Sequence, residues 1–361
     1  MISYAKQFID ESDVKAVVAA LKGDAITRGA QVTAFEEKLA ASCDATFAVA
    51  FSSGTAALEA AAFAAETCAH DRLITTPNTF VGSVAGFVKR GASLKLIDIE
   101  MPTANMNQEI LLKEINQPKT RGKEIILAVH FAGVAIDMEK VSVAITEPDT
   151  VLIEDAAHAL GSCYPSGKKV GSCAYSDMTI FSFHPAKQIT TGEGGAVLTN
   201  DPKYHERLKL FRNNGIVPTA DGLCYDVVAL TGNTNFTEFQ AALGLSQLKK
   251  LDSFVEKRRK LVRHYRLSLQ GRIPCLPEEY DARTSYHLFV VQLEERDRMR
   301  QKLQEAGIST QVHYPPLYRL SALSVTGEFP EMENYFAKAL TLPLHYGMTE
   351  ADVERVVSHL L

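Results

Sequence analysis

The stretch MTIFSFHPAKQITTGEGGAVLTN, residues 178–200, decides the fold of this chain. The apolar runs 178–183 and 196–199 each predict a short buried strand. Between them, Pro185 and three glycines predict an irregular loop, and this loop carries Lys187. A lysine held against apolar neighbours at the end of a strand can form a Schiff base. An ordinary solvated lysine is the common alternative, and the rest of the chain decides between the two.

Composition places the chain among ordinary globular proteins. Its 361 residues are 46% hydrophobic and 22% charged, enough for a large core and roughly two domains. A net charge of -5 gives no basic surface for nucleic acid or an anionic membrane. The six cysteines form no Cys-x-x-Cys pair, so we expect neither disulfides nor a metal site. Because there is no signal peptide and no apolar run of about 18 residues, we expect a cytoplasmic protein outside the membrane.

Five further apolar runs predict strands, at 46–51, 73–75, 94–99, 124–130 and 150–154. Between and before them we expect helices, among them 10–22, 56–67 and 81–90. Strands that alternate with helices predict an α/β fold with a mainly parallel central sheet flanked by helices. In such a sheet, ligands bind at the carboxyl ends of the strands.

Two backbone or aromatic groups follow predicted strands closely enough to meet at that edge. The turn at 52–55 leads from a strand directly into a helix, so the first backbone N–H groups of the helix are free to bind a phosphate. A simple helix cap by Ser53 or Thr55 is an equally common explanation of this turn. Phe80 follows the strand at 73–75 and is the aromatic candidate.

Two ionisable groups follow the strand at 150–154. Asp155 comes directly after apolar residues, where a carboxylate is costly to bury unless a cation faces it. A helix cap is the common alternative for such an acid. His158 lies three residues further on and could share the same side of a turn, although a structural histidine is the simpler interpretation.

The pattern changes after residue 236. Apolar residues keep a helical period from 236 to 270, which predicts one long helix that bridges two domains. Beyond it we expect a strand at 286–293, a helix at 296–306, a strand at 309–314 and a capped helix at 349–361. The expected domains are a large α/β domain at 1–240, and a connecting helix with a smaller C-terminal α+β domain at 241–361.

A phosphate cup, a carboxylate, an aromatic cover and a lysine together match pyridoxal 5'-phosphate (PLP), whose aldehyde condenses with a lysine amine. Lys187 is then expected to form the Schiff base and to move a proton during amino-group transfer. We expect Asp155 to pair with the ring nitrogen and Phe80 to stack on the ring. The remaining contacts, to the phosphate, are expected from the backbone of Gly54, Thr55 and Ala56 and from the Ser182 hydroxyl.

These motifs also carry a family resemblance. The stretches 53–58, 154–159, 181–195 and 211–215 resemble, in order and over nearly the whole chain, the DegT/DnrJ/EryC1/StrS nucleotide-sugar aminotransferases. The resemblance implies a fold-type I PLP-dependent aminotransferase. It also implies a homodimer with shared active sites, a keto-sugar nucleotide as acceptor and glutamate as amino donor.

Within the family, the stretches 158–162, 182–184, 189–191 and 242–248 are most similar to one branch. That branch aminates UDP-2-acetamido-2,6-dideoxy-β-L-arabino-hexos-4-ulose at C4 in pseudaminic acid biosynthesis. The resemblance implies that His158 lies near the 3-oxygen of the ring and that Asn233 reaches the cofactor phosphate of the other subunit. It further implies a substrate site lined by Tyr4, Asp24, Ala25, Ile26, Thr27, His313, Tyr314, Pro315 and Pro316.

Three alternatives remain open from the sequence. The first is an aminotransferase acting on another UDP-, dTDP- or GDP-keto-sugar, because nothing in the sequence reads the nucleotide base. The second is a non-catalytic regulatory protein of the same fold, against which Lys187 and Asp155 argue. The third is a PLP-dependent lyase or desulfurase, which usually needs a reactive cysteine or a carboxylate-binding arginine near the end of the chain. Arg355 is the one arginine of the last predicted helix, and the sequence assigns it no such role.

Overall fold

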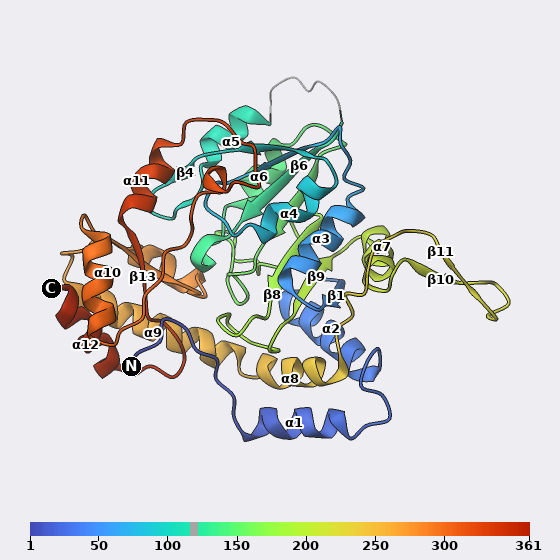
Figure 1. Ribbon diagram of the computed structural model, residues 1–361, viewed down its shortest axis with the longest axis horizontal. Helices are drawn as coiled ribbons and strands as arrows, with labels where there is room; N and C mark the ends of the chain where they lie inside the picture. Colours follow the sequence, from blue (N-terminus) through green and yellow to red (C-terminus); the bar gives the residue numbers. More distant parts are fainter. Residues whose placement is uncertain (116–121) are drawn as a thin grey trace.

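A computed structural model describes residues 1–115 and 122–361. The main strands are β1 (Phe47–Phe51), β2 (Arg72–Thr75), β3 (Ser93–Leu96), β6 (Glu124–Val129), β7 (Val151–Asp155), β8 (Met178–Ser182) and β9 (Gly195–Thr199). They form one seven-stranded sheet in the order β1-β9-β8-β7-β6-β2-β3 (Figure 1). β9 runs antiparallel to both of its neighbours, and the other adjacent pairs are parallel. The predicted α/β fold with a mainly parallel sheet is confirmed.

Both faces of the sheet are buried, which explains why its strands are continuous apolar runs. Along β6, Ile126 and Ala128 belong to one core cluster, whereas Ile125 and Leu127 belong to the other. The first face is covered by helices α2 (Ala30–Cys43), α5 (Gln108–Glu114), α6 (Met138–Ala144) and α8 (Glu238–Leu248). The second face is covered by α3 (Gly54–Ala64), α4 (Gly82–Lys89) and α7 (Pro202–Arg212). The sheet is therefore the middle of three layers.

The predicted single helix at 236–270 is wrong, because the chain forms two helices there. α8 ends at Leu248, and α9 (Leu251–Leu269) begins after a short break. Lys250 lies in this break, and its Nζ contacts Asp13 Oδ2 at 2.8 Å and Asp10 Oδ1 at 2.7 Å. These acids lie at the start of α1 (Glu11–Leu21), which packs against α8 (Figure 1). Apolar spacing cannot reveal such a break, since Leu248 and Leu251 keep the helical interval across it.

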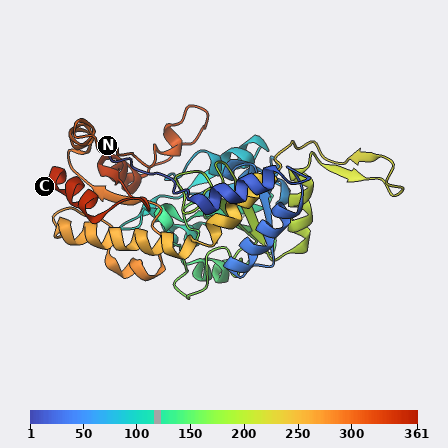
Figure 2. The same cartoon turned by 90° about the horizontal axis from the view of Figure 1, so that it is seen from below.

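α9 connects the sheet domain to a smaller C-terminal region. Buried residues at its start, such as Phe254, join the core beside the sheet, while Leu261 and Tyr265 join a separate C-terminal core. In that region, β12 (Phe289–Gln292) pairs antiparallel with β13 (Ala339–Leu342). Helices α10 (Arg296–Glu305), α11 (Pro330–Lys338) and α12 (Glu350–Leu360) surround the pair. Figure 2 shows α9 running along the underside of this region.

One predicted C-terminal strand is wrong. The segment 309–314 forms no strand, and only Gln311 bridges to Thr341 of β13. The chain turns away at Pro315 and Pro316, which have no N–H group with which to continue the pairing. The actual partner of β12 is β13, a strand that was not predicted.

The remaining elements are short. β4 (Ile99–Glu100) pairs with β5 (Asn105–Met106), and β10 (Ile216–Pro218) pairs with β11 (Tyr225–Val227) in a hairpin. This hairpin extends away from the body of the molecule in both views (Figures 1 and 2). Short 3₁₀ helices lie at Phe131–Gly133, Glu278–Arg283 and Leu317–Arg319. Within residues 1–115 and 122–361, no helix has both the length and the apolar character that crossing a membrane requires.

Candidate active site

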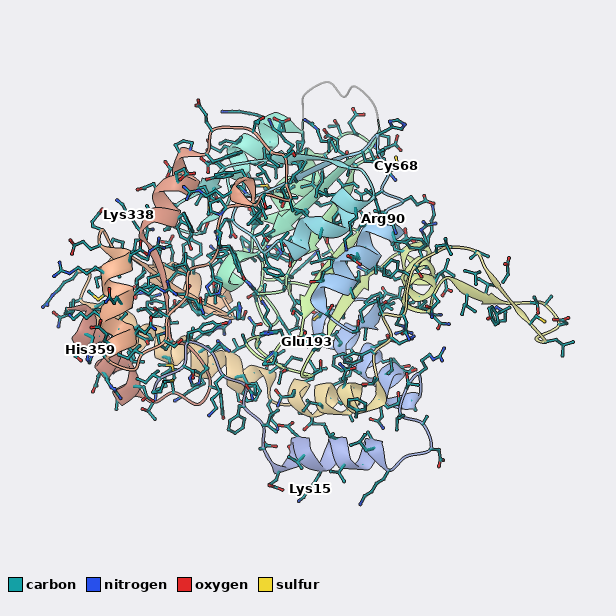
Figure 3. The ribbon with its side chains drawn as sticks, viewed as in Figure 1. Lys15, Cys68, Arg90, Glu193, Lys338 and His359 are labelled. Carbon is teal, nitrogen blue, oxygen red and sulfur yellow. The ribbon has the colours of Figure 1, made fainter. Side chains whose placement is uncertain are left out.

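The segments that follow β1, β2, β7 and β8 surround one cavity of about 400 Å³. These strands run in the same direction, so their carboxyl ends lie at one edge of the sheet. Ten residues with a predicted role line this cavity: Tyr4, Gly54, Thr55, Phe80, Asp155, His158, Ser182, Lys187, His313 and Tyr314. Glu193 also lines it, from the loop between β8 and β9 that Figure 3 shows near the centre of the molecule.

Lys187 lies in the loop after β8. Its backbone N–H donates to the His184 carbonyl at 2.9 Å, so the loop is closed by a tight turn. Its Nζ lies 3.4 Å from His287 Nε2. Burial lowers the pKa of Lys187 to about 8, and the nearby Asp155 carboxylate opposes part of this shift. A larger share of this amine is therefore neutral near pH 7 than in an exposed lysine.

Asp155 is the last residue of β7 and is 5% exposed. Its Oδ2 accepts a hydrogen bond of 2.6 Å from Ser83 Oγ, and its Oδ1 accepts one of 3.1 Å from the Ala157 N–H. Among the described residues, no lysine or arginine forms an ion pair with it. A buried carboxylate that is held only by neutral donors still favours a cationic partner.

The N-terminus of α3 closes one end of the cavity. Ser53 caps the helix, since its Oγ accepts the Ala56 N–H at 3.1 Å. The N–H of Ala56 is therefore used by the helix cap, whereas Gly54 and Thr55 line the cavity. A Cβ atom on Gly54 would lie 2.9 Å from Ser182 Cβ. Glycine thus lets the helix start approach β8 and keeps the first N–H groups beside Ser182.

Aromatic rings form the opposite wall. Phe80 is 56% exposed, which is unusual for phenylalanine and leaves its ring face open to the cavity. Its ring centroid lies 6.2 Å from that of Tyr314. Tyr314 Oη in turn lies 3.0 Å from His158 Nε2.

The hydrogen bonds of His158 define its tautomer. Its Nδ1 accepts the Ala132 N–H at 3.3 Å, so the proton of the neutral ring lies on Nε2 and is donated to Tyr314 Oη. Burial, with a smaller contribution from the Lys187 charge, lowers the pKa of His158 well below its ordinary value. The Tyr314 hydroxyl proton is thereby left to point elsewhere in the cavity.

Two further histidines complete the wall near Lys187. His313 Nδ1 lies 2.8 Å from Thr341 Oγ1, and burial lowers the pKa of His313 to about 4. His287 was not among the predicted site residues. No motif or spacing in the sequence marks it, because it lies a hundred residues from Lys187 and at the start of an unremarkable apolar run.

Several predicted residues lie outside this cavity. Ala56, Pro315 and Pro316 do not line it, and neither does Asn233, whose Oδ1 accepts the Asn235 N–H at 3.1 Å. Asp24 and Ala25 line a second cavity of about 730 Å³ between α1 and α8. Ile26 and Thr27 lie beside the start of α8, where the Ile26 carbonyl accepts the Glu238 N–H at 3.0 Å. Their proposed roles toward substrate or a partner subunit remain predictions.

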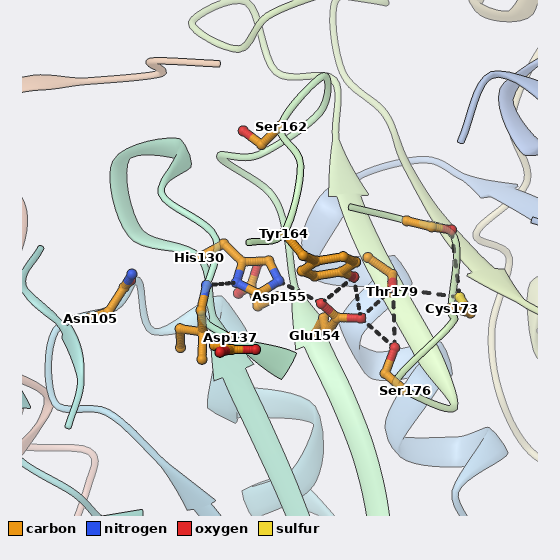
Figure 4. Close-up of polar contacts among 12 residues, drawn as sticks. Asn105, His130, Asp137, Glu154, Asp155, Ser162, Tyr164, Cys173, Ser176 and Thr179 are labelled. Atoms are coloured by element: carbon orange, nitrogen blue, oxygen red, sulfur yellow. Dashed lines mark hydrogen bonds and ion pairs between the residues drawn. The ribbon is translucent and has the colours of Figure 1, made fainter. Parts of the chain in front are cut away.

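Glu154, next to Asp155 in sequence, points away from the cavity into a buried polar network (Figure 4). It accepts hydrogen bonds from His130 Nε2 at 2.6 Å, Tyr164 Oη at 2.7 Å and Thr179 Oγ1 at 3.0 Å, and a further one from Ser176 Oγ. Burial opposes ionisation, but these donors outweigh it and lower the pKa of Glu154. The network holds the end of β7 in place on the side away from the cavity.

The chain matches the DegT/DnrJ/EryC1/StrS aminotransferase family over residues 7–361. It is 34% identical to a UDP-4-amino-4,6-dideoxy-N-acetyl-beta-L-altrosamine transaminase of Campylobacter jejuni, over 99% of this chain and 96% of the relative. Among solved structures it is similar to Helicobacter pylori PseC, an aminotransferase of pseudaminic acid biosynthesis. That comparison gives a TM-score of 0.92 at 29% identity and covers 99% of this chain and 98% of the other.

A PLP form of Spr1654 from Streptococcus pneumoniae is also similar. The TM-score is 0.89 at 29% identity, with 99% of this chain and 97% of the other covered. These neighbours confirm the predicted fold-type I aminotransferase fold, and they agree with PLP-dependent chemistry. The chain therefore belongs to the DegT/DnrJ/EryC1/StrS aminotransferase family.

Proposed function

We propose that this protein transfers an amino group from glutamate to C4 of UDP-2-acetamido-2,6-dideoxy-β-L-arabino-hexos-4-ulose. The product is UDP-4-amino-4,6-dideoxy-N-acetyl-β-L-altrosamine, a precursor for pseudaminic acid. The observation that carries the proposal is the placement of Lys187 and Asp155 in one cavity of a chain with full-length similarity to such a transaminase. A cytoplasmic location is part of the same proposal.

The residues of the cavity fit pyridoxal phosphate in four respects. Asp155 is a buried carboxylate with neutral donors and no cationic partner in the described chain, as a protonated ring nitrogen requires. Gly54 holds the start of α3 so close to Ser182 that a side chain there would collide, which suits a phosphate bound by backbone N–H groups and a hydroxyl. Phe80 offers an exposed ring for stacking. Lys187 is the residue that would hold the cofactor covalently.

When bound, the cofactor supplies an electron sink that makes a C–H bond of the amino donor acidic. Lys187 Nζ is the group that would accept and return that proton. Its pKa of about 8 matters for this task. At pH 7 roughly a tenth of such amines are neutral, compared with roughly three in ten thousand at the ordinary lysine pKa. Asp155 would keep the ring nitrogen protonated, and the Tyr314–His158 pair would present a hydroxyl proton to the cavity.

We also propose a homodimer in which Asn233 reaches the partner's cofactor phosphate. The position of Asn233 outside its own cavity supports this role. The β10–β11 hairpin supports a partner as well, because it extends from the body and exposes Leu223 and Tyr225 at 83% and 65%, and Leu230, just after it, is 96% exposed. Sedimentation equilibrium on the full chain tests the dimer, and a monomer at micromolar concentration would contradict it.

The activity is tested by incubating purified protein with glutamate and three acceptors. These are the proposed UDP-sugar, its C5 epimer and a dTDP-4-keto-6-deoxyhexose, and mass spectrometry detects the added amine. We expect amination of the first acceptor. Preference for another acceptor would keep the chemistry but move the enzyme to a different nucleotide sugar.

Lys187→Ala is the matched variant for this test, with Lys15→Ala as an exposed control on α1. The first change should remove turnover without loss of folded structure, whereas the second should have no effect. Normal transamination by Lys187→Ala would refute the proposed function.

A further inference from the structure

His287 occupies a buried position beside the amine of Lys187. It is 5% exposed, and its Nε2 lies 3.4 Å from Lys187 Nζ. Its Nδ1 is buried and has no hydrogen-bond partner within the described part of the chain. A buried imidazole with one unsatisfied nitrogen is costly, and such exceptions require a reason. Among the residues that the structure describes, this ring has one side-chain hydrogen-bonding contact, to Lys187 Nζ.

The backbone of His287 is fixed by an unusual arrangement. Tyr286, directly before it, adopts a left-handed conformation with φ of 49°, which strains the backbone of a bulky residue. The His287 N–H donates to the Ala132 carbonyl at 2.9 Å, and the Ala132 N–H donates to His158 Nδ1. Ala132 is itself left-handed, with φ of 57°. One strained turn therefore anchors both histidines, whose ring centroids lie 4.3 Å apart.

Arg258 of α9 binds the backbone on both sides of the contact between His287 and Lys187. It is 3% exposed, and its Nη1 donates to the carbonyls of Tyr286 and His287, each at 3.3 Å. Its Nη2 lies 3.5 Å from the Lys187 carbonyl. No described acid forms an ion pair with it, and burial lowers the pKa of Arg258 to about 10. A buried arginine that binds only carbonyl groups serves to fix backbone positions.

We propose that His287 is a positioning residue that orients the free amine of Lys187 through Nε2. This inference rests on the proposed function, in which that amine carries the proton. A neutral imidazole can serve both states of the amine, because Nε2 accepts from an ammonium in one tautomer and donates to a neutral amine in the other.

Burial and the charges of the groups that face His287 favour its neutral ring. These groups are Lys187, His158, Arg258 and His313, which are cationic or neutral and none of which is acidic. Burial and these neighbours lower the pKa of His287 well below the ordinary histidine value. The ring therefore holds its hydrogen-bonding role across the working pH range.

The test compares His287→Phe, which removes the nitrogen, with His287→Gln, whose amide reaches a similar position. His345→Phe is the matched control, because His345 is also a buried histidine with an unpartnered Nδ1 but lies outside the cavity. The first readout uses the protein stripped of cofactor. Reductive methylation from pH 6 to pH 10, with mass spectrometry of the modified peptides, gives the pKa of Lys187 relative to the exposed Lys15 (Figure 3).

We expect His287→Phe to lower the pKa of Lys187 by about one unit, since an ammonium loses its acceptor. In the holoenzyme, kcat should fall about tenfold to a hundredfold while KM for the nucleotide sugar stays within about twofold. His287→Gln should recover most of both effects, and His345→Phe should show neither. The inference is overturned if His287→Phe leaves the Lys187 pKa and kcat unchanged, or if His287→Gln loses as much as His287→Phe.

The two proposals fail in different ways. Absence of aminotransferase activity in the wild-type protein, with every acceptor, overturns the proposed function. The pKa of Lys187 in the stripped protein is independent of that result. An unchanged pKa in His287→Phe still counts against His287, and a shifted pKa still supports its contact with the amine.

Discussion

Ser83 and Asp155 form a buried pair in the cavity. Ser83 Oγ, on α4, donates to Asp155 Oδ2 at 2.6 Å and also lies 2.7 Å from Thr79 Oγ1. This chain of hydroxyl groups sets the direction of the carboxylate toward the cavity. The contribution of the Ser83 hydroxyl can be measured separately from the charge of Asp155, because Ser83 can be replaced while Asp155 is kept.

Ser83→Ala should weaken binding of pyridoxal phosphate about fivefold to tenfold, since one hydrogen bond to the carboxylate is lost at a net value of about 1 kcal/mol. Absorbance titration of the stripped protein with the cofactor measures this change. Ser142→Ala is the control, because the Ser142 hydroxyl donates to the Glu139 carbonyl on the exposed side of α6, away from the cavity. Affinity within twofold of wild type would show that Asp155 needs no such support.

Residues at strand ends could be predicted from the sequence, whereas their supporting partners could not. Lys187, Asp155 and Phe80 each follow an apolar run, and the parallel sheet brings such positions to one edge. Ser83 lies inside a helix, and His287 lies in a distant segment. Their positions depend on how α4 and the C-terminal region pack, which local patterns of hydrophobicity do not encode.

At the scale of the elements, the junction of β1 and α3 leaves no room for a side chain. A Cβ on Gly54 would approach Ser182 Cβ at 2.9 Å, and a Cβ on the neighbouring Gly195 would meet the Ser53 carbonyl oxygen at 2.6 Å and Gly54 backbone atoms at 2.7 Å. α3, β8 and β9 are thus in backbone contact at the cavity. A side chain at Gly54 or Gly195 would force these elements apart.

Gly54→Ala should therefore weaken cofactor binding more than about tenfold, because the helix start must move away from Ser182. Equilibrium dialysis of the stripped protein with pyridoxal phosphate measures the affinity. Gly232→Ala is the matched control, since a Cβ on Gly232 meets no atom within 4 Å. Equal affinities for the two variants would contradict the proposed phosphate site.

The Glu154 network joins β7 to β8 behind the cavity. Glu154→Gln should destabilise the protein by about 2–4 kcal/mol at pH 7, because an amide N–H₂ would face groups that are already donors. The pKa of Glu154 is lowered on folding, so its stabilisation is complete above the ordinary value of 4.5 and is lost as pH falls below it. Urea unfolding should show a difference between the two proteins that narrows below pH 4.5.

Glu147→Gln, at an exposed position, should leave stability unchanged at both pH values. The opposite outcome is that the wild-type protein and Glu154→Gln differ by the same free energy of unfolding below pH 4.5 as at pH 7. That result would mean that the charge of Glu154 does not provide the stabilisation.

Each predicted strand of the sheet overlaps an observed strand, because continuous apolar runs bounded by turns are a strong local signal. The predicted strand at 94–99 is too long, since β3 ends at Leu96 and Ile99 belongs to β4 of a separate sheet. The break between α8 and α9 was missed because Leu248 and Leu251 keep the helical interval. Tertiary contacts made by Lys250 with Asp10 and Asp13 accompany this break, and sequence periodicity does not report such contacts.

At the scale of the whole molecule, we propose a division into a sheet domain at 1–240 and a second unit at 241–361. α9 bridges them, since Phe254 packs in the core beside the sheet and Leu261 packs in the C-terminal core. The N-terminus crosses this division, because Ile2 joins the C-terminal core and its N–H donates to the Gly307 carbonyl at 2.8 Å. The first residues therefore attach the second unit to the start of the chain, with Tyr4 at the cavity.

Because the two units have separate cores joined by one helix, we expect each unit to open locally with its own free energy. Leu261 is fully buried in the C-terminal core, so Leu261→Ala should cost about 2–5 kcal/mol and leave a cavity beside α12. Hydrogen exchange should then show faster exchange in α12 and β13, while β6 and β7 keep their protection. Leu152→Ala, in β7 and in the core beside the sheet, should give the opposite pattern. If both variants accelerate exchange equally in all these elements, the two units unfold as one, and α9 is part of a single cooperative core.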